Sequence, residues 1–171
     1  VRPARRAQLE RDRLRIDSPL GHATIAVNTV DAADVGPDYD YVLLSCKAYD
    51  LESAMEAIAP AIGERTIIVP LLNGMAHLAR LDDRFGAPRV LGGTCWISAT
   101  LDADGVIRQV DPVQRVVFGD RGGVKSGRGV DLGPGQPLQG AHGHLAQAAV
   151  GPDRAVGEGQ AGGLQAAVKV R

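Results

Sequence analysis

Residues 40–74 read DYVLLSCKAYDLESAMEAIAPAIGERTIIVPLLNG, and this stretch decides the fold. It contains two continuous apolar runs, at residues 41–46 and 66–72, and each is followed by one polar residue, first Lys47 and then Asn73. Unbroken apolar runs are typical of parallel strands that are covered on both faces. Open α/β sheets bind ligands at the carboxyl ends of such strands, where a lysine reaches phosphate or carbonyl oxygens and an asparagine amide both donates and accepts. The stretch therefore predicts a nucleotide site at the end of a parallel strand pair.

Helical patterns alternate with these two strands. Asp50 is placed to cap a helix that Gly63 ends, and four apolar side chains recur along it at helical spacing: Leu51, Met55, Ile58 and Ile62. A second helix is predicted over residues 75–84, ended by Gly86 and Pro88. The order is strand, helix, strand, helix, which predicts an α/β sheet.

The flanking segments extend this sheet. A short helix is predicted over residues 3–13, with a proline in its first turn. Five extended segments are predicted outside the central stretch: residues 14–16, 22–27, 90–100, 106–110 and 115–118. Turn residues at 18–21 join the first two, and a turn at 102–105 joins the later ones into an antiparallel addition. The whole pattern predicts a doubly wound sheet with a mixed edge.

Composition excludes several classes of partner. The chain has 171 residues, 44% of them hydrophobic, and a net charge of -1, which indicates no bulk attraction to nucleic acid or membrane. Its apolar runs are much shorter than the roughly 20 residues of a membrane span, and no apolar signal-peptide core is present at the start. Six arginines between residues 2 and 15 resemble a transit peptide, but acidic residues interrupt them and a solvated helix is simpler. We expect a cytoplasmic protein.

The cysteines and histidines give no metal site. Cys46 and Cys95 lie inside apolar runs without metal-ligand spacing, which predicts buried free thiols in a reducing compartment. His142 and His144 have no third ligand at suitable spacing. His22 and His77 are isolated and are interpreted as turn or surface residues.

The last 52 residues, 120–171, differ from the rest. From residue 121 onward the chain has no Ile, Phe, Trp, Tyr, Met, Cys, Thr or Asn, and it is rich in glycine and alanine. Such a segment buries too little apolar surface to offset its ordering entropy, so we expect disorder, or a tail read in a shifted frame. Only residues 164–170 have the composition of a short helix. Two glycine-rich matches, a dinucleotide fingerprint at 157–162 and a partial P-loop at 119–126, are attributed to chance because neither follows a convincing strand.

Five short motifs occur in an order that is similar to a known family. They are VRP at residues 1–3, LRIDSPLG at 14–21, DYVLLSCKAY at 40–49, LLNGM at 71–75 and VLGGT at 90–94. This order resembles the N-terminal NADP-binding domain of the ketopantoate reductases (2-dehydropantoate 2-reductases) over residues 1–119. The resemblance implies an α/β, Rossmann-like doubly wound sheet, incomplete here because the first strand and its Gly-rich loop would precede Val1.

The resemblance also implies cofactor-binding residues. Arg2 falls where the family places an arginine against the 2′-phosphate of NADP, and a guanidinium fork suits that group. Arg5 and Arg6 are neighbours that could substitute for it. The alternative is that all three are solvated charges on a helix.

Three further positions follow from the same resemblance. Lys47 corresponds to the family lysine at the cofactor site, although a surface lysine is the simpler alternative. Asn73 matches the asparagine that contacts the cofactor near its nicotinamide end and the substrate, although Asn-Gly alone also fits a turn. Ala99 falls where the family places a backbone contact to the cofactor.

Departures from the family pattern limit the prediction. The family's proton-donating lysine lies in a helical C-terminal domain that this sequence does not show, so no catalytic residue is assigned. Leu72 stands where the family often has a polar residue, and Ala76 where it often has glycine. These differences weaken the substrate side of the site.

The function implied by the resemblance is reduction of 2-dehydropantoate to pantoate by NADPH, a step of pantothenate and coenzyme A biosynthesis. We expect the chain by itself to be inactive, because the phosphate loop and the proton donor would both lie elsewhere. Two alternatives stay open: a relative acting on another 2-keto acid, and a nonenzymatic remnant that binds a nucleotide or a partner chain. A sheet edge left exposed by a missing first strand would favour self-association.

Overall fold

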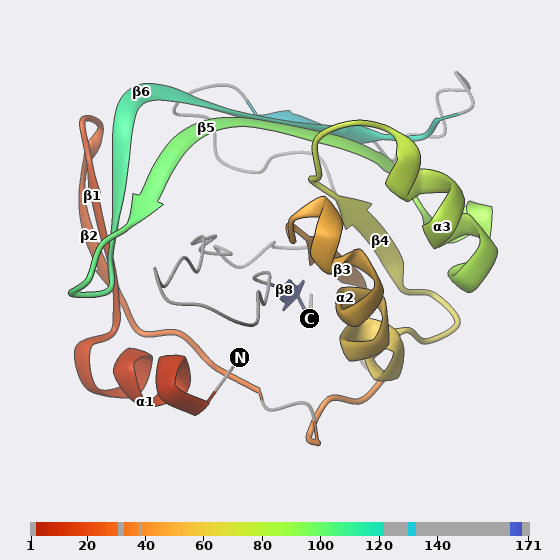
Figure 1. Ribbon diagram of the computed structural model, residues 1–171, viewed down its shortest axis with the longest axis horizontal. Coiled ribbons are helices and arrows are strands. Elements are labelled where there is room, and N and C mark those ends of the chain that lie inside the picture. The colour runs from red at the N-terminus through yellow and green to blue at the C-terminus, as the bar shows by residue number, and fades with distance from the viewer. Residues whose placement is uncertain (1–2, 31–32, 38, 122–129, 133–164, 169–171) are drawn as a thin grey trace.

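The computed structural model describes residues 3–30, 33–37 and 39–121, together with two short strands at 130–132 and 165–168 (Figure 1). Its helices are α1 (Pro3–Asp12), α2 (Leu51–Ile58) and α3 (Ala76–Phe85), with 3-10 turns η1 (Ala48–Asp50), η2 (Ala59–Ala61) and η3 (Ala87–Arg89). Its strands are β1 (Leu14–Ser18), β2 (Gly21–Ile25), β3 (Tyr41–Leu44), β4 (Ile67–Pro70), β5 (Gly92–Leu101), β6 (Val106–Gly119), β7 (Val130–Leu132) and β8 (Gln165–Val168). The predicted mixed α/β fold is confirmed, and its described strands form two sheets, one in the order β2-β1-β6-β5 with β7 beside β6, and one in the order β4-β3-β8.

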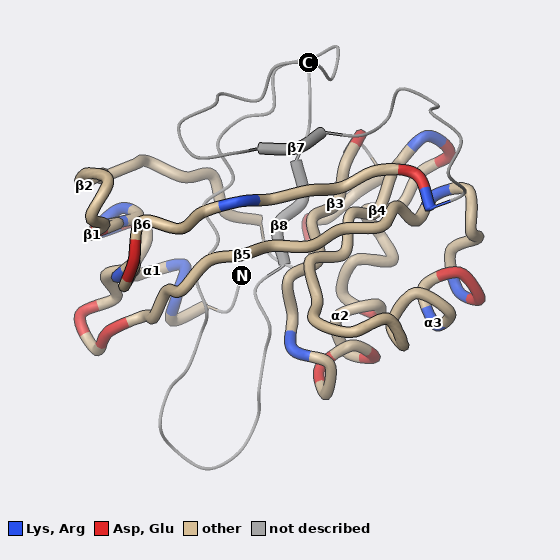
Figure 2. The backbone as a smooth tube through the Cα atoms, turned by 90° about the horizontal axis from the view of Figure 1, so that it is seen from above, with Lys and Arg blue, Asp and Glu red and all other residues tan. Residues whose placement is uncertain are grey.

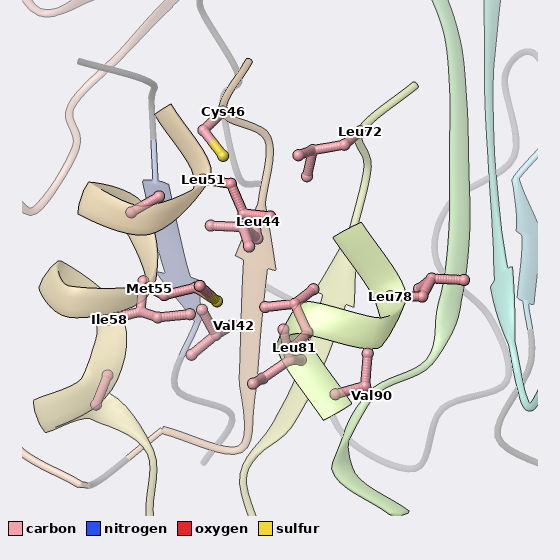
Figure 3. Close-up of a cluster of buried hydrophobic side chains, with 13 residues drawn as sticks. Val42, Leu44, Cys46, Leu51, Met55, Ile58, Leu72, Leu78, Leu81 and Val90 are labelled. Carbon is pink, nitrogen blue, oxygen red and sulfur yellow. The ribbon is translucent and has the colours of Figure 1, made fainter. Parts of the chain in front are cut away.

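The central strands pair in parallel, as predicted. Tyr41 lies opposite Ile67 and Leu44 opposite Pro70, and the Leu71 amide donates to the Leu44 carbonyl at 2.8 Å. Val42 and Leu44 point into a cluster with residues of α2 and α3 (Figure 3). Alternate residues along β3 and β4 join Leu91 and Phe118 in a second cluster. Both faces of the strand pair are therefore covered, one by helices and the other by the long strands β5 and β6.

The connecting helices follow the sequence pattern closely. The predicted apolar positions Leu51, Met55 and Ile58 are all buried, because they recur on the face that meets β3. The helix ends at Ile58, earlier than predicted, because Pro60 continues the chain as a 3-10 turn. Asp50 occupies the N-cap of α2, but its side chain makes no capping hydrogen bond. The position of that cap was predicted correctly and its hydrogen bond was not.

The antiparallel addition is larger than predicted. Residues 106–110 and 115–118, predicted as separate strands, belong to one strand, β6, which pairs with β5 and, in parallel, with β1. Pro112 lacks an amide donor, and residues 110–113 have no register partners on β5. The Asp111 carboxylate accepts from the Val113 amide at 2.8 Å, and the Gln109 side chain donates to the Val113 carbonyl at 3.2 Å. These local bonds hold Val113 within the irregular segment around the proline.

The tail contributes two described strands. β7 pairs with β6, and β8 pairs antiparallel with the edge of β3 that faces away from β4. The helix predicted over 164–170 is wrong for its described part, because Gln165–Val168 is a strand. An open strand edge offers a row of backbone partners, and these override the weak local preference of Gln-Ala-Ala-Val. His142, His144, and the glycine-rich segments at 122–126 and 157–162 lie outside the described residues.

The two cysteines differ in how far they are buried. Both are free thiols, but only Cys46 is buried, whereas Cys95 on β5 is half-buried. Burial raises the pKa of both thiols above the ordinary value. The prediction of buried thiols is thus confirmed for Cys46 and only partly for Cys95. Within the described residues, no helix is long and apolar enough to cross a membrane.

Candidate functional site

The carboxyl ends of β3 and β4 bring the two predicted polar residues to one edge. Leu44 and Pro70 are register partners, and Lys47 and Asn73 are each the third residue after them. Both residues are exposed. Because the strands are parallel, these positions emerge side by side at the edge where α/β sheets bind ligands. We call this edge the strand-end edge. It comprises the residues that follow β3 as far as Asp50 and the residues that follow β4 as far as Met75.

Lys47 is held between buried neighbours. Cys46 before it and Leu51 after it both belong to the core cluster. The lysine itself has an extended backbone, and its carbonyl accepts from the Asp50 amide at 2.9 Å, which starts the turn into α2. The backbone at this position is therefore fixed while the ammonium group is presented to solvent.

Asn73 lies on a short loop with a similar anchor. Leu72, which departs from the family pattern, is buried in the core cluster, so its apolar side chain holds the end of β4 in place. Gly74 follows with φ +82, a left-handed backbone that a side chain would disfavour. α3 then begins after Met75, whose side chain makes no cap hydrogen bond. The loop thus exposes the asparagine directly before a helix.

Asp50 is a polar group of this edge that the sequence analysis treated only as a helix cap. Its residue is 8% exposed, and its carboxylate makes no cap bond. Among the described residues, no hydrogen bond or ion pair involves that carboxylate. Its oxygens are not among the fully buried side-chain atoms that lack a partner, so they keep some contact with solvent and are free to accept a hydrogen bond from a ligand hydroxyl group. In the sequence, the only indication of a further role for Asp50 was its position between Lys47 and the predicted helix. A helix cap explains that position equally well.

β5 approaches the strand-end edge through a glycine. A Cβ at Gly93 would overlap the backbone carbonyl oxygen of Pro70, the last residue of β4. The backbone of β5 therefore passes directly against the end of β4, next to the loop that carries Asn73. The signal for this close approach was the Gly92-Gly93 pair inside an otherwise extended run.

The other predicted residues that the structure describes are not grouped with Lys47 and Asn73. Arg2 lies outside the described residues. Arg5 donates to the Gln8 side chain at 2.7 Å and to the Gly105 carbonyl at 3.3 Å, and Arg6 pairs with Glu10 at 2.8 Å. Both of these arginines are bonded on α1 or to the neighbouring turn, which Figures 1 and 2 place at the opposite end of the molecule from α2 and α3.

Ala99 also lies at the α1 end of the molecule. It pairs with Gln109 next to an irregularity in the β5–β6 register, and it packs against the cluster of Leu9, Leu14 and Ile107. The structure therefore does not bring Ala99 together with Lys47 and Asn73, and its cofactor contact stays a prediction.

A hollow of about 440 Å³ lies between α1, β1 and the β5–β6 turn, away from the strand-end edge. Three arginines line it: Arg11 is paired with Asp12 at 2.7 Å, Arg108 with Asp17 at 2.5 Å and Asp102 at 2.9 Å, and Arg15 donates to the Asp104 backbone carbonyl. Figure 2 shows the alternating charges of this region. Because two of these three arginines are paired with carboxylates and the third is bonded to the backbone, we assign the hollow no ligand.

The two described histidines behave differently. His22 is exposed, as predicted, and its Nδ1 lies 2.7 Å from Asp17. His77, in the first turn of α3, is buried, so its interpretation as a surface residue is wrong. Burial lowers the pKa of His77, and the nearby Arg121 charge lowers it further. Arg121 is held in place by the Val90 carbonyl at 3.1 Å and by Asp82 at 2.5 Å.

The buried imidazole predicts a pH-dependent stability. In the unfolded chain a histidine takes up a proton near pH 6.5, whereas in the folded protein His77 stays neutral to a lower pH. Below about pH 6.5 the unfolded state therefore binds more protons, and stability falls as the pH is lowered. We expect His77→Gln to reduce this loss, measured as the difference in urea midpoint between pH 7 and pH 5.5. The exposed His22→Gln variant is the control, and an unchanged pH dependence in His77→Gln would contradict the assignment.

Comparisons with known proteins agree on one family. The sequence model described as ketopantoate reductase PanE/ApbA matches residues 1–123. The uncharacterized oxidoreductase YkpB of Bacillus subtilis (strain 168) is 34% identical over 128 residues, which is 75% of this chain and 42% of that protein.

Solved structures show the same relationship. A 2-dehydropantoate 2-reductase from Porphyromonas gingivalis W83 matches with a TM-score of 0.58 and 33% identity, covering 66% of this chain and 41% of that one. A D-mandelate dehydrogenase in complex with NADH and anilino(oxo)acetate shares the fold, with a TM-score of 0.55 and 21% identity over 60% of this chain and 33% of that one. The chain thus spans between 33% and 42% of the length of these three relatives. On the family match over residues 1–123, the chain belongs to the ketopantoate reductase PanE/ApbA family.

Proposed function

We propose that this chain supplies the dinucleotide-binding side of an oxidoreductase that reduces 2-dehydropantoate to pantoate with NADPH. The observation that carries the proposal is the strand-end edge, where Lys47 and Asn73 follow two paired parallel strands at equal distance along the chain. Family membership supports the reaction class, because the family is that of the ketopantoate reductases.

The residues of the edge suit a nucleotide cofactor. The Lys47 ammonium binds a phosphate or a ribose oxygen, and the Asn73 amide donates and accepts at once. The Asp50 carboxylate, which has no partner among the described residues, accepts from a ribose hydroxyl. When bound, NADPH supplies the hydride that reduces the 2-keto carbon of the substrate. By the family resemblance, Asn73 contacts the cofactor near its nicotinamide end and also contacts the substrate.

Two further contacts belong to the proposal through the family resemblance. Arg2 binds the 2′-phosphate, which selects NADP over NAD, and the backbone at Ala99 contacts the cofactor. The cofactor-binding part is residues 1–119, and residues 120–171 take no part in it. The protein acts in the cytoplasm, in the route to pantothenate.

The proposal includes the expectation that the 171-residue chain does not turn over by itself. More than half the length of each relative has no counterpart in the matched region, and no proton donor for the reaction is assigned among the described residues. NADPH oxidation in the presence of 2-dehydropantoate, followed by absorbance, tests this point. Measurable turnover by the purified chain would contradict it.

Binding is tested separately from turnover. In a ligand-observed NMR titration with NADPH, we expect Lys47→Ala to weaken binding by about ten- to a hundredfold, because a hydrogen bond to a charged group contributes roughly 1.5–3 kcal/mol. We expect Asn73→Ala to weaken it less. Loss of binding in both variants supports the strand-end edge as the cofactor site.

The matched control is Arg65→Ala. Arg65 is also an exposed cation, but it precedes β4 and so lies at the opposite end of the strand pair. We expect this variant to bind NADPH as the wild type does. Equal weakening by Arg65→Ala and Lys47→Ala would indicate general charge attraction and would contradict a specific site.

A further inference from the structure

Two large apolar side chains stand exposed at the strand-end edge. Tyr49 is 77% exposed and Met75 is 74% exposed, the highest values for large hydrophobic residues in the described part of the chain. Each is the fifth residue after one of the register partners, Leu44 for Tyr49 and Pro70 for Met75. The two apolar residues thus repeat, at one edge, the equal spacing of the polar pair Lys47 and Asn73.

The backbone holds both apolar residues in place. Tyr49 lies in η1, directly before α2, and Met75 is the N-cap of α3. Leu51, two residues after Tyr49, and Leu72, three residues before Met75, are both buried in the core cluster. Met75 has no polar atom that caps a helix, so helix capping does not explain it. A single exposed hydrophobic residue is ordinary, whereas two of them beside a polar pair at a ligand-binding edge suggest a binding surface.

We propose that Tyr49 and Met75 form the apolar part of the nucleotide site and contact a flat heteroaromatic ring of the ligand. This inference rests on the proposed function and adds to it the residues that recognise the ring. A phenol ring stacks on a flat heterocycle, and a methionine sulfur packs against an aromatic ring. Lys47 and Asn73 bind the polar groups of the same ligand. The ring is that of nicotinamide or of adenine, and the experiment distinguishes them.

The sequence offers a direct probe, because it contains only two methionines, Met55 and Met75. Labelling both with carbon-13 at the methyl group gives two resonances. Met55 is 2% exposed inside the core cluster and serves as an internal control. When an aromatic ring packs against Met75, its ring current moves the Met75 methyl signal upfield and leaves that of Met55 unchanged.

The labelled chain is titrated with NADPH, nicotinamide mononucleotide, adenosine monophosphate and ribose 5-phosphate. We expect an upfield shift of Met75 with NADPH and with one of the two mononucleotides, which identifies the ring. Ribose 5-phosphate has no ring and is expected to give no such shift. We also expect Tyr49→Ser to weaken NADPH binding about tenfold, the size of one aromatic contact, while Tyr49→Phe retains it. Val110→Ser, which alters another exposed apolar residue on β6, is the control.

The outcomes separate this inference from the proposed function. NADPH binding that is weakened by Lys47→Ala, but that neither shifts Met75 nor depends on Tyr49, overturns the apolar contact and leaves the proposed function standing. An absence of NADPH binding in ligand-observed NMR overturns both. An equal loss of binding in Val110→Ser and Tyr49→Ser also overturns the inference, because it shows a general effect of removing surface hydrophobic groups.

Discussion

Replacing Gly93 with alanine is expected to lower the free energy of unfolding by about 1–3 kcal/mol, the usual cost of forcing a methyl group into a filled space. The new Cβ would overlap the Pro70 carbonyl oxygen, and the Leu71 side chain lies 3.3 Å from the same point. A flexible side chain could move aside, but a backbone carbonyl that ends a paired strand cannot move without shifting β4. Urea unfolding followed by circular dichroism measures the change.

The same substitution is expected to weaken ligand binding, because the end of β4 carries the loop with Asn73. Gly36→Ala is the matched control: a Cβ at Gly36 meets nothing within 4 Å, and the alanine is expected to be neutral or slightly stabilising. If Gly93→Ala unfolds at the wild-type urea concentration, β5 does not pass against Pro70 as described.

Leu44→Ala is expected to cost about 2–5 kcal/mol, the range observed for large-to-small changes in protein cores. Leu44 is 0% exposed, lies at the carboxyl end of β3 and contacts the cluster formed with α2 and α3. Removing its side chain leaves a cavity under both helices, at the point where β3 leads into Lys47. The free energy of unfolding from urea titration gives the size of the effect.

Leu20→Ala provides the comparison, because Leu20 is 52% exposed in the turn between β1 and β2 and should change stability little. A cost for Leu44→Ala no greater than that for Leu20→Ala would show that β3 is not a central strand. A large cost without loss of helical signal would support cavity formation in an otherwise intact fold.

Much of the fold could be predicted because local patterns carry it. The continuous apolar runs at 41–46 and 66–72 indicate strands covered on both faces whatever covers them, and the spacing of Leu51, Met55 and Ile58 indicates one buried helix face. The strand-end edge could be predicted in the same way, because parallel strands joined by a helix must end at the same side. The same pattern indicated a nucleotide site at Lys47 and Asn73, whereas the contacts proposed for each of them with NADP come from the family resemblance.

Other features depend on partners far away in the chain. β6 passes Pro112 through an irregular segment in which the side chains of Gln109 and Asp111 bond to Val113, and the stretches on either side pair with β5. The strand at Gln165–Val168 exists because β3 offers an open edge, not because of its own composition.

The sequence by itself determined the parallel strand pair, the helix that follows each of its strands and the edge at which polar residues emerge, because apolar periodicity reports which faces of each element are buried. Only the tertiary structure decided that His77 is buried beside Arg121, that Asp50 lies buried without a cap bond, and that β5 passes against Pro70 at Gly93. Burial and close approach depend on what packs against a residue, and those neighbours come from distant parts of the chain.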